Sequence, residues 1–136
     1  MGLRRDLRLR RRADFDAVFK SGRIWADHLL VLRALPNNLD HNRYGFVTSK
    51  KLGGAVVRNR TRRRLREIAR ETPARDGYDV VLSAKSVAAS AEFSALRESV
   101  AKLMAKAPEG RYTGTDEVSY EVRSANRAEM PELSRR

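Results

Sequence analysis

The chain has 136 residues, of which 41% are apolar, and this fits a single folded domain with a buried core. It carries 29 basic and 17 acidic side chains, a net charge of +12, which predicts a polyanionic partner. The absence of cysteine excludes disulfides, cysteine-ligated zinc and thiol catalysis. No apolar run is long enough to span a membrane, and the basic N-terminus lacks the apolar stretch of a secretory signal, so we expect a cytoplasmic protein.

The first half of the sequence predicts one helix followed by three strands. Apolar residues recur at helical spacing in residues 13–20, and a Ser-Gly pair ends that helix. Strand-like residues follow at 23–26, 29–35 and 44–49, and a Pro-Asn-Asn turn at 36–38 separates the last two.

The second half predicts two longer helices on either side of one strand. A loop with two glycines precedes the helix at 55–70, which Pro73 ends. A short apolar run at 78–83 is typical of a buried strand, and residues 93–106 return to helical spacing. The order α-β-β-β-α-β-α predicts an α/β (α+β) two-layer sandwich with helices packed on one mixed four-stranded sheet.

The composition changes near residue 107, which predicts a domain boundary there. Residues 1–106 hold 24 basic and 11 acidic side chains, whereas residues 107–136 hold 5 and 6. The second segment also has two prolines, two glycines and little apolar periodicity. We therefore expect an RNA-binding domain at 1–106 and an appended tail at 107–136 that is disordered or weakly ordered.

Arginine accounts for 23 of the 29 cations, and its planar guanidinium suits phosphate contacts and base stacking. One cluster lies at residues 4–12 and a second, with seven arginines, at residues 58–70. Arginines spaced four apart on the helix repel one another unless an anion offsets their charge. A solvated helix face is the alternative interpretation, but Glu67 and Glu71 alone balance the charge locally.

Three segments resemble the bacterial ribonuclease P protein component. Residues 50–67 read KKLGGAVVRNRTRRRLRE and contain the family's RNR motif at Arg58, Asn59 and Arg60. Residues 9–23, LRRRADFDAVFKSGR, resemble the family's first helix, and residues 78–81, YDVV, its last strand. The resemblance covers about residues 7–106 and implies a ribosomal protein S5 domain 2-like fold with a left-handed crossover, where residue patterns alone favour a right-handed one.

The resemblance also implies a function. Proteins of this family join a catalytic RNA that removes the 5′ leader from precursor tRNA. The RNA carries out the hydrolysis with bound Mg²⁺, and the protein binds the leader in a cleft. The chain is thus expected to act as a non-catalytic subunit, with no metal held by its own side chains. Its expected partners are the catalytic RNA and precursor tRNA.

The site residues follow from the match to the family's motifs. Those expected to bind RNA are Arg58, Asn59, Arg60, Arg62, Arg63 and Arg66 on the basic helix, and Lys50 and Lys51 before it. Asn59 can donate and accept, so it can bridge RNA, metal-bound water or backbone, or simply be a polar residue at a helix start.

The expected leader cleft involves the first helix and the second strand. Phe15 and Phe19 match its aromatic edge, where bases stack, although both also fit an ordinary helix core. Arg11 and Arg12 lie where the phosphates would run. Arg33 stands where the family often has an aromatic residue, and its guanidinium can replace that stacking contact.

Three other functions remain as alternatives. A nuclease active by itself needs a metal-holding cluster, yet the acidic residues and His28 and His41 show no ligand spacing. A ribosomal-type structural RNA-binding protein would share the fold and the charge. A DNA-binding module lacks the expected helix-turn-helix or zinc finger.

Overall fold

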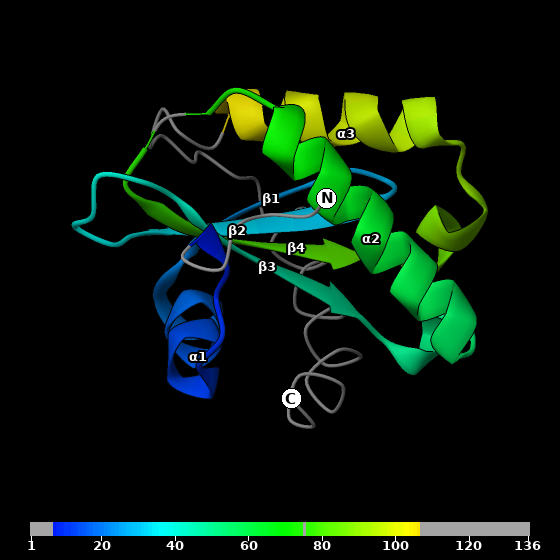
Figure 1. Cartoon of the computed structure of the whole chain (residues 1–136), viewed down its shortest axis with the longest axis horizontal. Helices are drawn as coiled ribbons and strands as arrows, with labels where there is room; N and C mark the ends of the chain where they lie inside the picture. The colour runs from blue at the N-terminus through cyan, green and yellow to red at the C-terminus, as the bar shows by residue number, and fades with distance from the viewer. Residues whose placement is uncertain (1–6, 75, 107–136) are drawn as a thin grey trace.

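The computed structural model describes residues 7–74 and 76–106, and the tail predicted at 107–136 lies outside them. Figure 1 shows one sheet with helices on both of its faces. The helices and strands are α1 (Arg12–Ser21), β1 (Arg23–Ala26), β2 (Leu30–Pro36), β3 (Arg43–Thr48), α2 (Ala55–Glu71), β4 (Tyr78–Ala84) and α3 (Phe93–Lys106). The predicted element order is confirmed. Two 3-10 turns, η2 (Lys50–Leu52) and η3 (Ser86–Ser90), were not predicted.

The four strands form a mixed sheet in the order β1-β2-β4-β3. β2 runs antiparallel to both β1 and β4, and β3 runs parallel to β4. β4 therefore inserts between two strands that precede it in the chain, and β3 becomes an edge of the sheet. The predicted mixed four-stranded sheet is confirmed.

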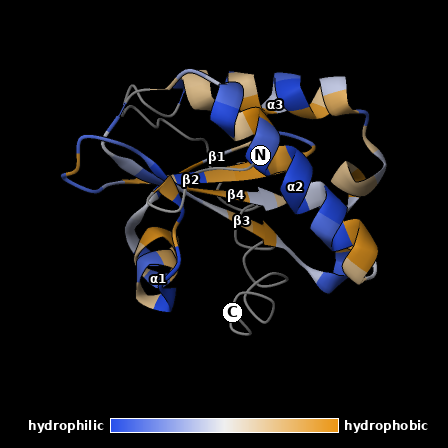
Figure 2. Cartoon of the chain, viewed as in Figure 1, coloured by the Kyte–Doolittle hydropathy of each residue, from blue (hydrophilic) through white to orange (hydrophobic). Residues whose placement is uncertain are grey.

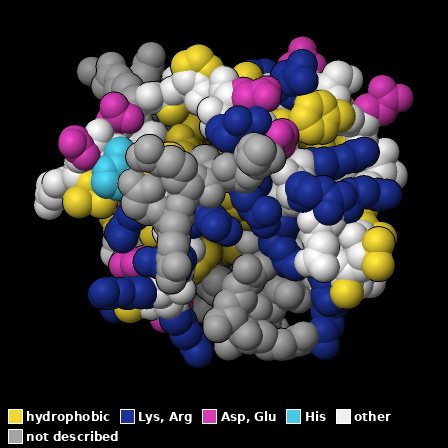
Figure 3. All heavy atoms as spheres, viewed as in Figure 1, with side chains coloured by type: hydrophobic (Ala, Val, Ile, Leu, Met, Phe, Trp, Pro, Cys, Tyr) yellow, Lys and Arg dark blue, Asp and Glu magenta, His cyan; other side chains and the backbone are white. Residues whose placement is uncertain are grey.

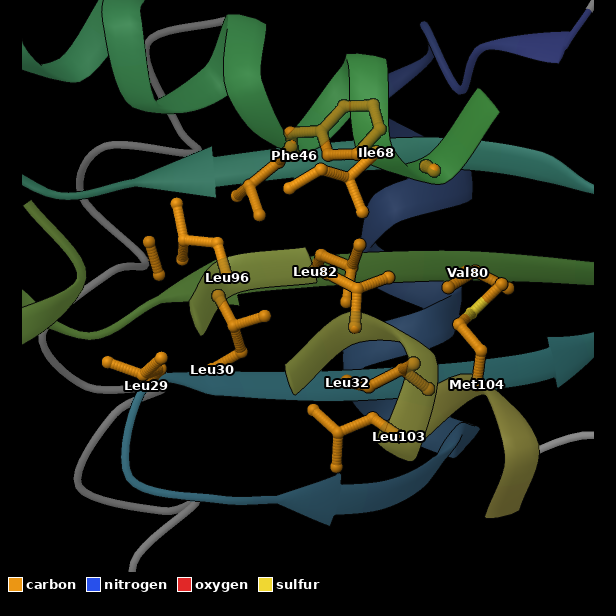
Figure 4. Packing of buried hydrophobic residues seen from close by; sticks show 14 of the residues in the cluster. Leu29, Leu30, Leu32, Phe46, Ile68, Val80, Leu82, Leu96, Leu103 and Met104 are labelled. Atoms are coloured by element: carbon orange, nitrogen blue, oxygen red, sulfur yellow. The ribbon is translucent and has the colours of Figure 1, made fainter. Parts of the chain in front are cut away.

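The connection from β3 through α2 to β4 has an unusual hand. Parallel neighbours need a crossover, and here α2 supplies it on the face of the sheet that α3 also covers. Followed along the chain in Figures 1 and 4, this crossover is left-handed. About 98% of such connections are right-handed. The right-handed crossover expected from residue patterns alone is therefore wrong, and the left-handed crossover implied by the resemblance is confirmed.

The main core lies between the sheet and the helices α2 and α3. Leu30 and Leu32 of β2 and Leu82 of β4 point into it, where they meet Ile68 of α2 and Leu96 of α3 (Figure 4). Each of these side chains is at most 1% exposed. Figure 2 shows the matching amphipathic pattern, with hydrophilic residues on the outer side of α2. Burial of this apolar face holds α2 on the sheet despite its charge.

The opposite face of the sheet carries α1 and a smaller core, formed by Leu9, Phe15, Val18, Val47 and Val81. Gly45 of β3 makes room for it, because a Cβ there would lie 2.4 Å from Cε1 of Phe15. A glycine inside a strand often marks such a close approach. The ring of Phe15 thus packs directly on the backbone of the edge strand.

An ion-pair network joins α1 to the sheet. Arg43 of β3 donates two hydrogen bonds to the buried carboxylate of Asp79 on β4, at 2.9 and 2.7 Å. Its third nitrogen lies 3.6 Å from the carboxylate of Asp14 on α1. The Asp79 hydrogen bonds and the charges of both carboxylates raise the pKa of Arg43, which outweighs its partial burial. Arg43 is therefore a fixed cation that positions α1 at the β3 edge.

Candidate RNA interface

A groove of about 260 Å³ opens along β3 at the edge of the sheet, between α1 on one side and α2 on the other. Half of its lining residues are arginines, and three of the others are aromatic. The lining residues are Arg8, Leu9, Arg10, Arg12, Phe15, Tyr44, Gly45, Phe46, Arg62 and Arg66. Phe15, Tyr44 and Phe46 are between 5% and 8% exposed, so the groove combines cations for phosphates with the edges of three mostly buried rings.

The segment before α1 forms one wall of the groove by pairing with β3. Leu9 donates its N–H to the carbonyl of Tyr44 at 2.8 Å, and Arg8 forms a parallel bridge with the same residue. The chain then turns away into α1 at Arg11. This pairing stops at Tyr44, and the next two residues of β3, Gly45 and Phe46, line the groove.

The two aromatic residues of α1 have different environments. Phe15 lines the groove, but it is only 5% exposed because its ring lies over Gly45. Phe19, one turn further along α1, is half-buried and does not line the groove. Phe15 is thus mainly a core residue whose edge reaches the groove, and Phe19 retains some exposed surface.

Arg33 is fully buried and has no exposed surface for contact with RNA. Its guanidinium carbon lies 4.4 Å from the centroid of the Phe19 ring, and its Nη1 donates to the hydroxyl of Ser83 at 3.2 Å. The expectation that Arg33 stacks on a leader base therefore needs correction. Its side chain lies on the α1 face of β2 and is covered by the helix, so it stacks on Phe19 instead.

The arginines of α2 are divided between two sides of the helix. Arg62 and Arg66 face the groove. Arg60 and Arg64 lie toward the turn before α3, where they donate to the carbonyls of Ala89 and Ala91 at 3.4 and 3.1 Å. Arg63 is exposed. Figure 3 shows basic side chains gathered over α2 and around α1, with acidic ones along the upper part of the view, near α3, and at its left.

Arg62 connects the groove to the RNR motif. Its Nη1 donates to the hydroxyl of Thr48 at the end of β3, at 2.6 Å, and its Nη2 donates to the side-chain oxygen of Asn59. Thr48 is fully buried, whereas Asn59 is exposed. The guanidinium of Arg62 is therefore held by two hydrogen bonds, one to the sheet and one to the exposed side of α2.

The remaining expected residues lie around this centre. Arg12 lines the groove and is 3.7 Å from Asp16, and Arg11 is exposed at the start of α1. Lys50 and Lys51 are exposed on η2, which follows β3, but they do not line the groove. The hydroxyl of Ser49 accepts from the Lys51 N–H at 3.3 Å and so helps shape this turn.

Sequence reasoning did not single out several groove residues. Arg8 and Arg10 belonged to a noted arginine cluster, but nothing placed them beside β3. Tyr44, Gly45 and Phe46 read as ordinary strand residues. The available signal was the glycine inside a strand, which indicates close approach of another group.

The described residues include no group of three His, Cys, Asp or Glu side chains able to hold a metal ion. His41 lies 2.9 Å from Asp40, and this contact lowers the pKa of that exposed carboxyl group. In the part of the chain that the structure describes, no helix is both long and apolar enough to cross a membrane.

Comparison with known proteins identifies the family. Residues 3–108 match the family model described as Ribonuclease P. The ribonuclease P protein component of Dehalococcoides mccartyi is 42% identical over 100 residues, covering 74% of this chain and 83% of that protein. That of Caldanaerobacter subterraneus is 41% identical over 103 residues, covering 74% and 89%.

Solved structures agree in fold. The RNase P protein of Staphylococcus aureus superposes with a TM-score of 0.67 at 29% identity, covering 75% of this chain and 97% of that one. The RNase P protein of Thermotoga maritima gives a TM-score of 0.65 at 31% identity, covering 71% and 94%. The arginine-rich α2, the groove beside it and these likenesses lead to one conclusion: the chain belongs to the family of bacterial ribonuclease P protein components.

Proposed function

We propose that this ribonuclease P subunit binds the 5′ leader of precursor tRNA in the groove along β3. The observation that carries the proposal is the lining itself, in which five arginines surround Phe15, Tyr44 and Phe46. A single strand presents unstacked bases and a charged backbone, and this lining offers a partner for each. A duplex keeps its bases stacked, so the aromatic part of the groove would have nothing to contact.

The outer side of α2 forms a second surface, which we assign to the catalytic RNA. Asn59, Arg60 and Arg63 are exposed and do not line the groove. Arginine contacts to phosphates supply affinity that does not depend on sequence. One helix would therefore bind the leader on one side and the catalytic RNA on the other, which would hold the substrate beside the RNA.

The hydrolysis itself is assigned to the RNA. The described residues bring together no cluster of three acidic or histidine side chains, and cations dominate the groove. These residues do not fit a Mg²⁺ ion held by the protein, so the ion is assigned to the RNA. The work is expected to take place in the cytoplasm, where bacterial tRNA precursors are made.

A reconstitution assay tests this function. The purified chain is added to a bacterial ribonuclease P RNA, and cleavage of precursor tRNA is followed with and without each component. We expect no cleavage by the chain alone and faster cleavage by the RNA when the chain is present. Metal-dependent cleavage by the RNA-free chain, or no effect on the RNA, would refute the proposal.

The groove is tested by comparing precursor and mature tRNA. Arg12→Gln combined with Arg66→Gln should weaken binding of the precursor roughly tenfold or more, since charge-assisted contacts are lost. Binding of mature tRNA, which has no leader, should change little. The control replaces Lys102 and Lys106, which are exposed on α3, with Gln and so removes the same charge. Equal losses for both tRNAs would place the leader elsewhere.

A further inference from the structure

The side chain of Asn59 has a defined orientation that limits what it can offer to RNA. Nη2 of Arg62, one turn further along α2, donates to the side-chain oxygen of Asn59. A guanidinium carries donors and no acceptor, so the atom of Asn59 that faces it must be the oxygen. The amide nitrogen, with its two donors, then points away from Arg62.

Arg62 is itself anchored. Its Nη1 donates to Oγ1 of Thr48 at 2.6 Å, and Thr48 is fully buried at the end of β3. The guanidinium is planar and rigid, so fixing one nitrogen also fixes the direction of the other. The sheet therefore determines, through Arg62, how the Asn59 amide faces solvent.

We propose that Arg62 is a positioning residue that makes Asn59 a hydrogen-bond donor to a phosphate oxygen of the catalytic RNA. This inference rests on the proposed function and adds the chemistry of one contact. Asn59 is exposed outside the groove, and its neighbours Arg60 and Arg63 are exposed cations that attract the RNA backbone. Within residues 7–74 and 76–106, no hydrogen bond is found that uses its amide nitrogen.

The alternative is that Asn59 contacts the RNA through a metal ion or a metal-bound water. Direct ligation requires the amide oxygen, because hard cations such as Mg²⁺ take oxygen ligands. That oxygen already accepts from Arg62. The two interpretations predict opposite effects of a carboxylate at position 59, and this difference provides the test.

The first measurement is the affinity of the full chain for the ribonuclease P RNA over a range of Mg²⁺ concentrations. Asn59→Ala should weaken binding about 10- to 150-fold at every concentration, as expected for one lost hydrogen bond to a charged group. Asn59→Asp should weaken it further, because a carboxylate would face a phosphate. If Asn59→Asp binds as well as the parent, or steepens the Mg²⁺ dependence, Asn59 is an oxygen ligand and the proposal is wrong.

The second measurement tests the role of Arg62. Arg62→Lys keeps the charge, but a single ammonium cannot reproduce the planar fork that holds Asn59. In the Arg62→Lys background, Asn59→Ala should lower the affinity for the RNA less than twofold. Arg63→Lys is the matched control, and there Asn59→Ala should keep its full cost. An unchanged cost in the Arg62→Lys background would show that Arg62 does not position Asn59.

Thermal melting checks that each variant folds, and the Mg²⁺ series with the exposed Asn59 variants decides the donor role if Arg62→Lys unfolds. Failure of this inference can be told apart from failure of the proposed function. A parent chain that neither binds the RNA nor speeds its cleavage contradicts the function. A parent chain that does both, with Asn59→Asp unimpaired, contradicts only the role assigned to Asn59.

Discussion

The guanidinium of Arg33 lies under the ring of Phe19, 4.4 Å from its centroid, and so joins the second strand to the first helix. Arg33 is fully buried, and it also donates a 3.2 Å hydrogen bond to the hydroxyl of Ser83 on β4. Attraction between a cation and an aromatic face is strongest where water is excluded. The pair therefore fixes α1 on the sheet, and through α1 it sets one wall of the groove.

This relationship predicts energetic coupling between the two residues. A double-mutant cycle with Arg33→Met and Phe19→Leu should give a coupling of about 0.5–2 kcal/mol in the free energy of unfolding, measured with urea. Because the guanidinium of Arg33 is fully buried, salt should screen it little, and the coupling should persist in high salt. Strictly additive effects would show that the two side chains lie together without stabilising one another.

Gly45 predicts a steric effect. In Gly45→Ala, the new Cβ on the edge strand β3 would lie 2.4 Å from the Phe15 ring, which is too close for two carbon atoms. We expect a loss of about 1–3 kcal/mol in the free energy of unfolding, as for other overpacked cores. Gly54→Ser is the control, because nothing lies within 4 Å of a Cβ there and serine is favoured before a helix. Equal stability of Gly45→Ala and the parent would mean that α1 moves away from β3 easily.

Asp27 predicts a dependence of stability on pH. Burial alone would raise its pKa, but hydrogen bonds from the Ser99 hydroxyl and the N–H groups of Leu30 and Leu29 outweigh burial and hold the pKa below its ordinary 3.8. A carboxyl group whose folded pKa is lowered stabilises the fold fully above its unfolded pKa. That contribution is lost as the pH falls through the folded pKa.

The corresponding variant is Asp27→Asn, compared with the parent by urea unfolding from about pH 6 down to about pH 3. The parent should be more stable at the upper end, and the difference should narrow below about pH 4. Glu98→Gln, at an exposed position on α3, should show no such narrowing. If the difference in the free energy of unfolding between the parent and Asp27→Asn stays constant over the whole pH range, the charge of Asp27 does not contribute to stability.

The exposed arginines of α2 predict a strong salt dependence of RNA binding. If the protein neutralises roughly 6–8 phosphates, affinity should fall about 10³-fold or more between low and moderately high salt. Arg60→Ala with Arg63→Ala should reduce the slope of log affinity against log salt by about 1–2. Lys102→Ala with Lys106→Ala removes the same charge from α3 and should leave the slope nearly unchanged. A parent slope near zero would mean that α2 does not face the RNA.

The sequence by itself determined the local elements and the family. Apolar spacing located each helix and strand to within one residue because these patterns depend on neighbours three, four or two positions apart. The RNR motif and its arginines were equally visible, since a motif of contiguous residues needs no knowledge of the fold. The same patterns placed Phe15 and Phe19 on one side of a helix. They did not decide whether these two residues belong to the core or to the cleft.

The tertiary structure decided which of these residues meet. Arg33 read as a cation at a strand position that could face RNA, and only the packing of α1 across β2 and β4 buries it under Phe19. The groove exists because β4 inserts between β2 and β3, which leaves β3 at an edge that residues 7–9 cover only in part. Strand order and crossover hand depend on contacts between residues far apart in the chain, and no local pattern encodes these contacts.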